Sequence, residues 1–238
     1  MAIDEALLDC FSPDTDPPIL RLYGWNPAAF SFGRFQNPEE TIDLGRCKTD
    51  NVQAVRRITG GGIIFHGSEL TYSLVVPTGF AGGGSRVKDA FFQLTSFLLD
   101  FYRQLGLDVD YAANLRTGER LGGRTALCFA GLESCDILIR GKKIGGNAQR
   151  RIRDIIFQHG SIPLESLTRE SQKYLLTPSR EIEESTTSLA AERVTDSREI
   201  LAAKVAASFS DRFGTSLCQC DLTEAEHARA RELIQKSA

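Results

Sequence analysis

The most informative segment of this chain is Arg56-Arg57-Ile58-Thr59-Gly60-Gly61-Gly62-Ile63-Ile64-Phe65-His66. Three consecutive glycines lose much conformational entropy on folding, so a purely structural role gives little reason to keep them. Without side chains, their backbone N–H groups can converge on an anionic or carbonyl oxygen, and the arginines beside them suit phosphate or carboxylate. The pattern predicts a ligand-binding loop, although a glycine-rich hairpin between two strands fits the same residues.

Two later segments add lysine, histidine and more glycine. Residues 128–151 contain a hairpin signal at Arg140-Gly141-Lys142 and the pair Gly145-Gly146, and residues 155–164 contain Gln158-His159-Gly160-Ser161. Taken together, the three segments resemble the lipoate-protein ligase A and octanoyltransferase family, which shares its catalytic fold with biotin protein ligases.

The resemblance rests on three motifs that occur in the family's order. The family pattern is Arg-Arg-x-(Thr/Ser)-Gly-Gly-Gly with a nearby His, then Gly-x-Lys-(Ile/Val)-x-Gly-x-Ala-Gln-x-Arg, then Gln-His-Gly-Ser-Ile, and the chain matches each one. Met1–Leu8 resembles the family's first helix, and Phe32–Asn37 resembles its early strand-and-loop signature. The family usually has a strand before that helix, so we expect the sheet to lack this strand at one edge.

Bulk composition is that of an ordinary globular protein. The chain has 238 residues, of which 42% are hydrophobic and 25% charged, and its net charge is -3. This charge does not favour nucleic acid or an anionic membrane as the main partner. The sequence has no apolar run long enough to span a membrane and no basic-then-apolar leader, so we expect a cytoplasmic protein.

Cysteines are the next class of candidate functional residues. In a cytoplasmic protein we expect thiols rather than disulfides. None of them forms a Cys-x-x-Cys pair, and we predict no metal site. The six cysteines are Cys10, Cys47, Cys128, Cys135, Cys218 and Cys220.

Hydrophobic periodicity predicts both helices and strands. We expect the strand at 29–33 to pair with the strand at 19–25, the segments 136–139 and 143–149 to form a hairpin, and residues 165–195 to contain a short helix and a loop without chemistry. The lone Trp25 should belong to the core or a pocket wall. Helices are predicted at 2–12, 41–47, 86–105, 200–213 and 223–236, and further strands at 52–57, 63–66, 70–77, 107–111 and 155–164.

These elements predict an α+β fold in which a mostly antiparallel, mixed sheet packs against helices. We expect one catalytic domain over residues 1–238, without a separate accessory domain. The resemblance implies the class II aminoacyl-tRNA synthetase and biotin-ligase type of fold.

Cys128 is the candidate nucleophile, and Lys143 follows it 15 positions later. A nearby lysine cation lowers a thiol pKa and so raises the fraction of reactive thiolate. From the residues alone, a small buried apolar residue is the favoured interpretation of Cys128. The resemblance favours catalysis, because one branch of the family carries Cys-Phe here with the same spacing to the lysine. We expect Cys135 to serve packing only, and His159 to be structural.

The resemblance implies transfer of an octanoyl or lipoyl group from acyl carrier protein to a lysine of a lipoyl domain, through a thioester on Cys128. Glycine cleavage H protein and the E2 component of 2-oxoacid dehydrogenases are the implied acceptors. Lys143 would hold the carbonyl oxygen. No cofactor, nucleic acid or membrane is expected. The implied substrate-binding residues are Arg57, Gly60, Gly61, Gly62, Ile63, His66, Gly145 and Gly146.

Other functions remain open at this stage. An ATP-dependent lipoate-protein ligase would use ATP and Mg²⁺ to form lipoyl-AMP, with Arg57, Gly62 and Lys143 binding the adenylate. An amidotransferase would move octanoyl between lipoyl domains through a cysteine. A non-catalytic acyl-binding relative would form no acyl-enzyme at all.

Overall fold

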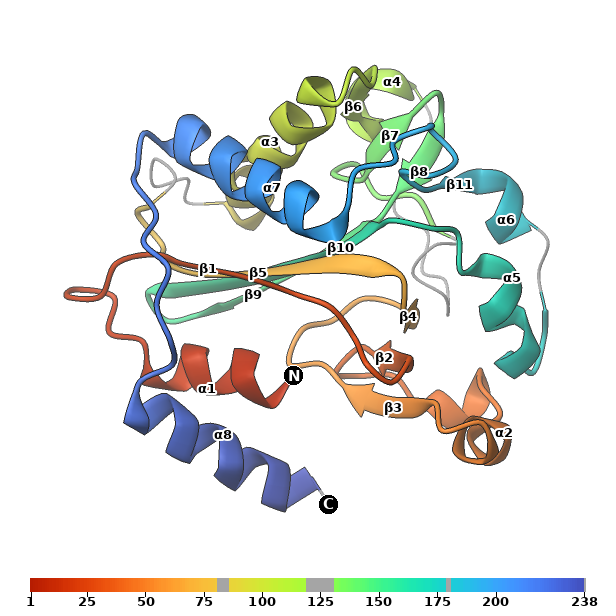
Figure 1. Ribbon diagram of the computed structural model, residues 1–238, viewed down its shortest axis with the longest axis horizontal. Helices are drawn as coiled ribbons and strands as arrows, with labels where there is room; N and C mark the ends of the chain where they lie inside the picture. The colour runs from red at the N-terminus through yellow and green to blue at the C-terminus, as the bar shows by residue number, and fades with distance from the viewer. Residues whose placement is uncertain (81–85, 119–130, 179–180, 238) are drawn as a thin grey trace.

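A computed structural model describes residues 1–80, 86–118, 131–178 and 181–237 of the chain. Helices and runs of consecutive strands occur along it, as expected for an α+β fold (Figure 1). In chain order they are α1 (Ala2–Cys10), β1 (Ile19–Tyr23), β2 (Ala29–Phe32), η1 (Pro38–Glu40), α2 (Leu44–Thr49), β3 (Gln53–Arg56), β4 (Ile64–His66), β5 (Glu69–Pro77), α3 (Val87–Gln104), β6 (Val109–Tyr111), α4 (Ala112–Leu115), β7 (Ile137–Ile139), β8 (Lys142–Ile144), β9 (Gly146–Ile152), β10 (Ile155–Pro163), α5 (Thr168–Ser171), η2 (Gln172–Tyr174), α6 (Glu181–Ser185), β11 (Thr186–Thr187), α7 (Arg198–Phe213) and α8 (Glu224–Ser237).

The largest sheet has the strand order β1-β5-β10-β9, and all its pairings are antiparallel. Helices α3 and α7 cover one face of this sheet, and α1 and α8 lie on the other (Figure 1). Strand β5 shows how the two faces are built, because successive side chains point to opposite sides. Tyr72, Leu74 and Val76 belong to the main hydrophobic core, whereas Val75 packs in a separate cluster with α1.

Two smaller sheets flank the large one. One has the order β3-β2-β4, with a parallel β2–β3 pair and an antiparallel β2–β4 pair. The other has the order β11-β8-β7-β6, in which only β11 pairs in parallel. The mixed, mostly antiparallel architecture predicted from the sequence is therefore confirmed, but it is divided among three sheets.

The expected pairing of the first two strands is wrong. Strand β1 pairs with β5, while β2 pairs with β3 and β4 in another sheet. Both strands are short and strand-like, but nearness along the chain does not determine pairing. All five residues of β1 pair with the long central strand β5.

The predicted strand at 143–149 is also corrected, because it breaks in two at Gly145. Lys143 belongs to β8 in one sheet, and Gly146 begins β9 in another. Gly145 has a φ of 72°, and a Cβ there would overlap the carbonyl oxygen of Ser161. Glycine tolerates both conditions, so it lets the chain pass between sheets.

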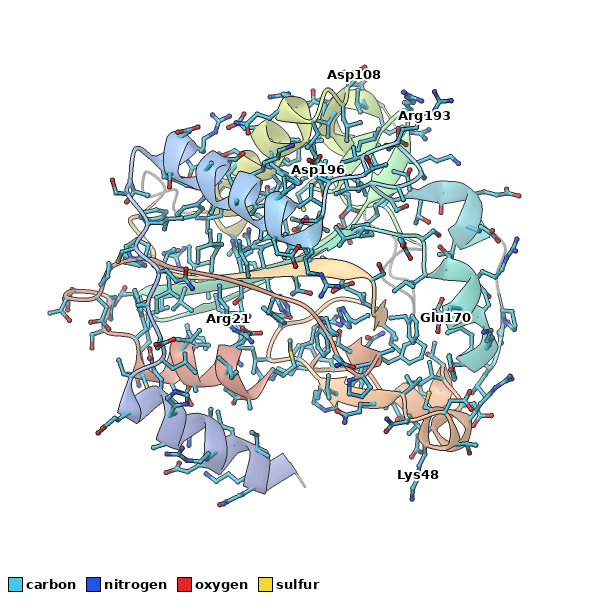
Figure 2. The ribbon with its side chains drawn as sticks, viewed as in Figure 1. Arg21, Lys48, Asp108, Glu170, Arg193 and Asp196 are labelled. Carbon is cyan, nitrogen blue, oxygen red and sulfur yellow. The ribbon has the colours of Figure 1, made fainter. Side chains whose placement is uncertain are left out.

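Helix α1 is fixed to the large sheet by a buried carboxylate. Asp4 is 1% exposed and accepts hydrogen bonds from Arg21 (2.7 Å), Tyr23 (2.8 Å) and Ser73 (2.8 Å). Figure 2 shows Arg21 in the layer between β1 and α1. Burial alone would raise the pKa of Asp4, but Arg21 and the other partners lower it overall. No helix in the described parts of the chain has the length and apolarity needed to cross a membrane.

Candidate functional site

Arg57 organises the glycine loop that follows β3. Its guanidinium donates to the carbonyl oxygens of Gly60 (3.2 Å) and Gly62 (2.6 Å), and to both the carbonyl oxygen (2.7 Å) and the hydroxyl (2.8 Å) of Ser31. The planar, always-charged guanidinium suits such a set of fixed acceptors. Arg57 is only 3% exposed, so it holds the loop against β2 from inside the protein.

The glycines of this loop differ in what the structure requires of them. Gly61 has a φ of 93°, and a Cβ on Gly33 would overlap the Gly61 carbonyl oxygen. A Cβ added at Gly60 would meet nothing within 4 Å. The loop thus requires glycine at 33 and 61 for backbone reasons, whereas position 60 has open space beside it.

His66 lies at the end of β4 in a chain of buried hydrogen bonds. Its Nδ1 is 2.6 Å from Glu69 Oε1, and its Nε2 is 2.5 Å from the Ser31 hydroxyl. Arg57 also donates to the Ser31 hydroxyl oxygen. Because an ionised carboxylate can only accept, His66 Nδ1 is the donor to Glu69. The ring also stacks on Trp25, with centroids 4.1 Å apart.

His159 is held nearby on β10. Its Nε2 is 2.7 Å from the Thr59 hydroxyl, in the loop that Arg57 organises. Burial lowers the pKa of His159 to about 3, and the Arg57 cation adds to this effect. His159 is therefore neutral at physiological pH and connects the glycine loop to the large sheet, in line with the structural role predicted for it.

These residues surround a cavity of about 360 Å³, which we call the motif cavity. Of the predicted substrate-binding residues, Arg57, Gly61, His66 and Gly146 line it. Trp25, Ile64, Thr71, Ala148 and His159 complete much of its wall. Trp25 was expected in the core or a pocket wall, and it lies in the wall.

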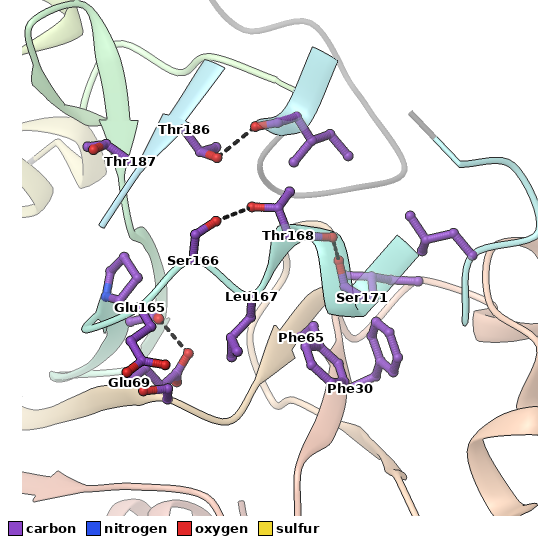
Figure 3. Close-up of a pocket in the computed structure, with 16 residues that line it drawn as sticks. Phe30, Phe65, Glu69, Glu165, Ser166, Leu167, Thr168, Ser171, Thr186 and Thr187 are labelled. Carbon is purple, nitrogen blue, oxygen red and sulfur yellow. Dashed lines mark hydrogen bonds between the residues drawn. The ribbon is translucent and has the colours of Figure 1, made fainter. Parts of the chain in front are cut away.

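A second, larger cavity of about 670 Å³ lies on the other side of β4, and we call it the hydroxyl cavity. Ile63 lines this one rather than the motif cavity, and Gly60, Gly62 and Gly145 are not among the described lining residues of either. Figure 3 shows Glu69 and Glu165 at one end of the cavity, Phe30 and Phe65 at another, and Thr186 and Thr187 across it. Much of the wall comes from residues 165–187, a region where the sequence predicted no chemistry.

Lys143 is buried in the neighbouring sheet, with 4% of its surface exposed. Its Nζ is 2.8 Å from Asp136 Oδ2 and 3.2 Å from the carbonyl oxygen of Gly131. Lys143 also pairs in register with Thr186, which lines the hydroxyl cavity. Sequence reasoning missed Asp136, although an acidic residue one hairpin away from a predicted functional lysine is a usable signal.

Cys128, the predicted nucleophile, lies outside the described residues. Cys135 is described, and burial together with the adjacent Asp136 raises the pKa of its thiol to about 11. A thiol with that pKa is protonated at neutral pH and a poor nucleophile, as its predicted packing role requires. The five cysteines in the described residues are all unbridged thiols. Within the same residues, no three His, Cys, Asp or Glu side chains are grouped as a metal site.

Comparison with known sequences places this arrangement in a family. The profile of the lipoyl protein ligase A/B catalytic domain matches residues 1–217. An octanoyltransferase LipM from Oceanobacillus iheyensis is 42% identical over 164 residues, which cover 69% of this chain and 59% of that protein. An octanoyltransferase LipM from Clostridioides difficile is 30% identical over 247 aligned positions, which cover 99% of this chain and 90% of that protein.

Solved structures show the same fold. A T. acidophilum protein assigned as a lipoate protein ligase, solved with bound lipoic acid, superimposes with a TM-score of 0.81. The two are 25% identical, and the match covers 99% of this chain and 88% of that one. A lipoate-protein ligase A bound with ATP gives a TM-score of 0.82 at 24% identity, with the same coverage. The chain belongs to the lipoyl protein ligase A/B catalytic domain family.

Proposed function

We propose that this protein transfers an octanoyl group from acyl carrier protein to a lysine of a lipoyl domain, through a thioester on Cys128. The observation that carries the proposal is the match to the C. difficile octanoyltransferase LipM, which spans 99% of this chain and 90% of that protein. Other relatives named octanoyltransferase LipM match over shorter segments, which cover 59% and 60% of their own lengths.

The motif cavity suits the acyl chain of this reaction. Trp25, Ile64 and Ala148 give it apolar wall, and Arg57, His66 and Gly146 add fixed polar groups. An apolar chain that ends in a carbonyl needs this combination.

Two bond exchanges complete the reaction. The Cys128 thiolate attacks the donor thioester, the carbon–sulfur bond to the donor breaks, and the donor leaves as a thiol after taking a proton. The acceptor lysine amine then attacks the new thioester, an amide forms, the Cys128 thiolate leaves, and the amine gives up a proton. Each tetrahedral intermediate carries an oxyanion, and hydrogen-bond donors around it stabilise the transition state.

Lys143 is our candidate for one of those donors. Its ammonium is held by Asp136 and by the Gly131 carbonyl oxygen. Gly131 follows Cys128 by three positions in the sequence. Lys143 is therefore anchored to a part of the chain close in sequence to the nucleophile. Asp136 joins it as a positioning residue.

An ATP-dependent lipoate ligase is the second candidate, and the 25% identity to the T. acidophilum protein solved with lipoic acid favours it. The charge of the larger cavity opposes nucleotide binding in that cavity. Glu69 and Glu165 line the hydroxyl cavity, and no lysine or arginine is among its described lining residues. Two carboxylates repel nucleotide phosphates, so the roomier cavity is a poor phosphate site.

Intact-mass measurement with octanoyl-acyl carrier protein and no ATP tests the proposal. We expect the wild-type protein and Cys135→Ser to gain one octanoyl group, and Cys128→Ser to gain none. Modification of a lipoyl domain only after lipoate and ATP are added would favour the ligase. An adduct that persists in Cys128→Ser would show that another residue is the nucleophile.

A further inference from the structure

The motif cavity and the hydroxyl cavity are separated by a single layer of protein. Strand β4 forms part of this layer, and its side chains alternate between the two sides as the strand geometry requires. Ile64 and His66 line the motif cavity, whereas Ile63 and Phe65 line the hydroxyl cavity. Beyond the end of β4, residues of other elements must separate the two cavities.

Glu69, the first residue of β5, lies in that gap. Its Oε1 accepts hydrogen bonds from His66 Nδ1 (2.6 Å) and the Thr71 hydroxyl (2.5 Å), and its Oε2 accepts one from the Ser161 hydroxyl (2.7 Å). All three donors line the motif cavity, whereas Glu69 itself lines the hydroxyl cavity. Ser161 lines both cavities. The Glu69 carboxylate thus sits between them, and Figure 3 shows it from the hydroxyl side.

The position is rigid and polar. Glu69 is 3% exposed, and Thr71 is itself fixed by a hydrogen bond from Trp25 Nε1 (2.9 Å). Burial alone would raise the pKa of Glu69, but His66 and the three hydrogen bonds lower it overall. An ionised, fully hydrogen-bonded carboxylate resists displacement, because moving it would leave buried donors without an acceptor. An apolar chain cannot pass through it.

We infer that the Glu69 side chain is a specificity-determining partition that ends the motif cavity and limits the length of the acyl chain that this cavity accepts. The inference rests on the proposed acyl-transfer function. With the partition removed, the two cavities would join, and a longer saturated chain could extend into the hydroxyl cavity toward Phe65 and Leu167. The inference assigns Glu69 no role in the bond-making and bond-breaking steps.

The preference of the protein for one acyl chain length over another tests the partition directly. Burial of one more methylene favours binding about four-fold, so four more methylenes set an upper limit of roughly 200-fold. For Glu69→Ala we expect the rate of dodecanoyl adduct formation relative to octanoyl, from the matching acyl carrier protein thioesters, to rise at least about 10-fold over wild type. Glu69→Gln keeps the volume and should keep the octanoyl preference. Glu165→Ala, which removes an exposed carboxylate from the same cavity, should also keep it.

Two further variants test whether a change in selectivity comes from the opened cavity and whether the protein still folds. Leu167→Trp fills the hydroxyl cavity, so adding it to Glu69→Ala should restore the octanoyl preference. If Glu69→Ala does not fold by thermal melting, Glu69→Ser opens the gap while retaining a hydroxyl for one of the donors. A folded, octanoyl-active Glu69→Ala or Glu69→Ser with unchanged selectivity would overturn the inference. So would a Glu69→Gln that accepts dodecanoyl as well as Glu69→Ala does.

Binding of free fatty acids separates this inference from the proposed reaction. Calorimetry with octanoate and dodecanoate needs no nucleophile and no acyl carrier protein. If wild type forms no adduct but Glu69→Ala gains dodecanoate affinity relative to octanoate, the partition stands and the transfer reaction fails. If adducts form and neither assay shows a change in selectivity, the reaction stands and the partition is wrong.

Discussion

The motif cavity and the hydroxyl cavity share a wall but are built differently. Arg57, His66 and His159 on the motif side are each no more than 5% exposed and hydrogen-bonded to neighbouring elements. On the hydroxyl side, Glu165 and Ser166 are exposed and come from a short connection before α5. The first cavity is therefore preorganised for one geometry, whereas the second can adapt at little cost. Substitutions on the motif side should therefore cost more stability than substitutions on the hydroxyl side.

The largest effect should follow from Arg57→Met. The change leaves the buried carbonyl oxygen of Ser31 and the partly buried carbonyl oxygens of Gly60 and Gly62 without this donor, so we expect a loss of about 3–5 kcal/mol in unfolding free energy. Arg56→Met is the matched control, because Arg56 is exposed, donates to loop carbonyl oxygens and otherwise lies over the Phe32 ring. It should lose less than about 1 kcal/mol. Urea denaturation measures the unfolding free energy of both variants. Equal losses would show that Arg57 contributes no more to stability than Arg56 does.

Glycine substitutions should give the next largest effect. Gly145→Ala combines a φ of 72° with overlap against Ser161, so we expect a loss of about 3 kcal/mol. Gly60→Ala has open space and no left-handed φ, and should be neutral or slightly stabilising. Thermal melting compares the two. A Gly60→Ala as damaging as Gly145→Ala would mean that the loop is packed more tightly than described.

His159 should make stability depend on pH. Its pKa is about 3 in the folded protein and near 6.5 when unfolded, so the unfolded state binds more protons between those values. Stability should then fall by about 1.4 kcal/mol per pH unit as pH drops from 6.5 toward 5. The lowered pKa values of Asp4 and Glu69 act only at more acidic pH.

His159→Gln should remove most of this pH dependence while keeping a partner for Thr59. Unfolding free energies at pH 7, 6 and 5 for both proteins give the difference in slope. Parallel slopes would show that His159 accepts a proton in the folded state.

The smallest effect should come from the hydroxyl side. Ser166→Ala removes an exposed hydroxyl whose hydrogen bond, at 2.8 Å, is to the Thr168 hydroxyl, so we expect a change within about 0.5 kcal/mol. Differential scanning calorimetry can resolve this. A loss of several kcal/mol would contradict the idea that this wall is adaptable.

The sequence predicted the fold class and most element positions because alternating and helical patterns are strong in this chain. Of the residues it named as substrate-binding, Arg57, Gly61, His66 and Gly146 line the motif cavity. It could not show that β1 pairs with β5, because pairing depends on burial between distant segments. The sequence did not predict the strand break at Gly145 for a similar reason, because only the contact with Ser161 reveals it.

The sequence alone could not predict the hydroxyl cavity or the Glu69 partition, for another reason. Serines, threonines and carboxylates at 165–187 follow no periodic pattern, and their convergence depends on β11 pairing beside β8. Glu69 looks like an ordinary polar residue at the start of a strand. Its importance appears only when His66, Thr71 and Ser161 are seen to point at one carboxylate.

The most direct test of the central claim follows one octanoyl group through both steps. The octanoyl-enzyme formed from octanoyl-acyl carrier protein is purified and mixed with an unmodified lipoyl domain, without ATP, and both masses are measured over time. We predict that the enzyme loses one octanoyl group at the rate at which the lipoyl domain gains it. An adduct that persists, or a lipoyl domain modified only after ATP is added, would contradict transfer through the enzyme thioester.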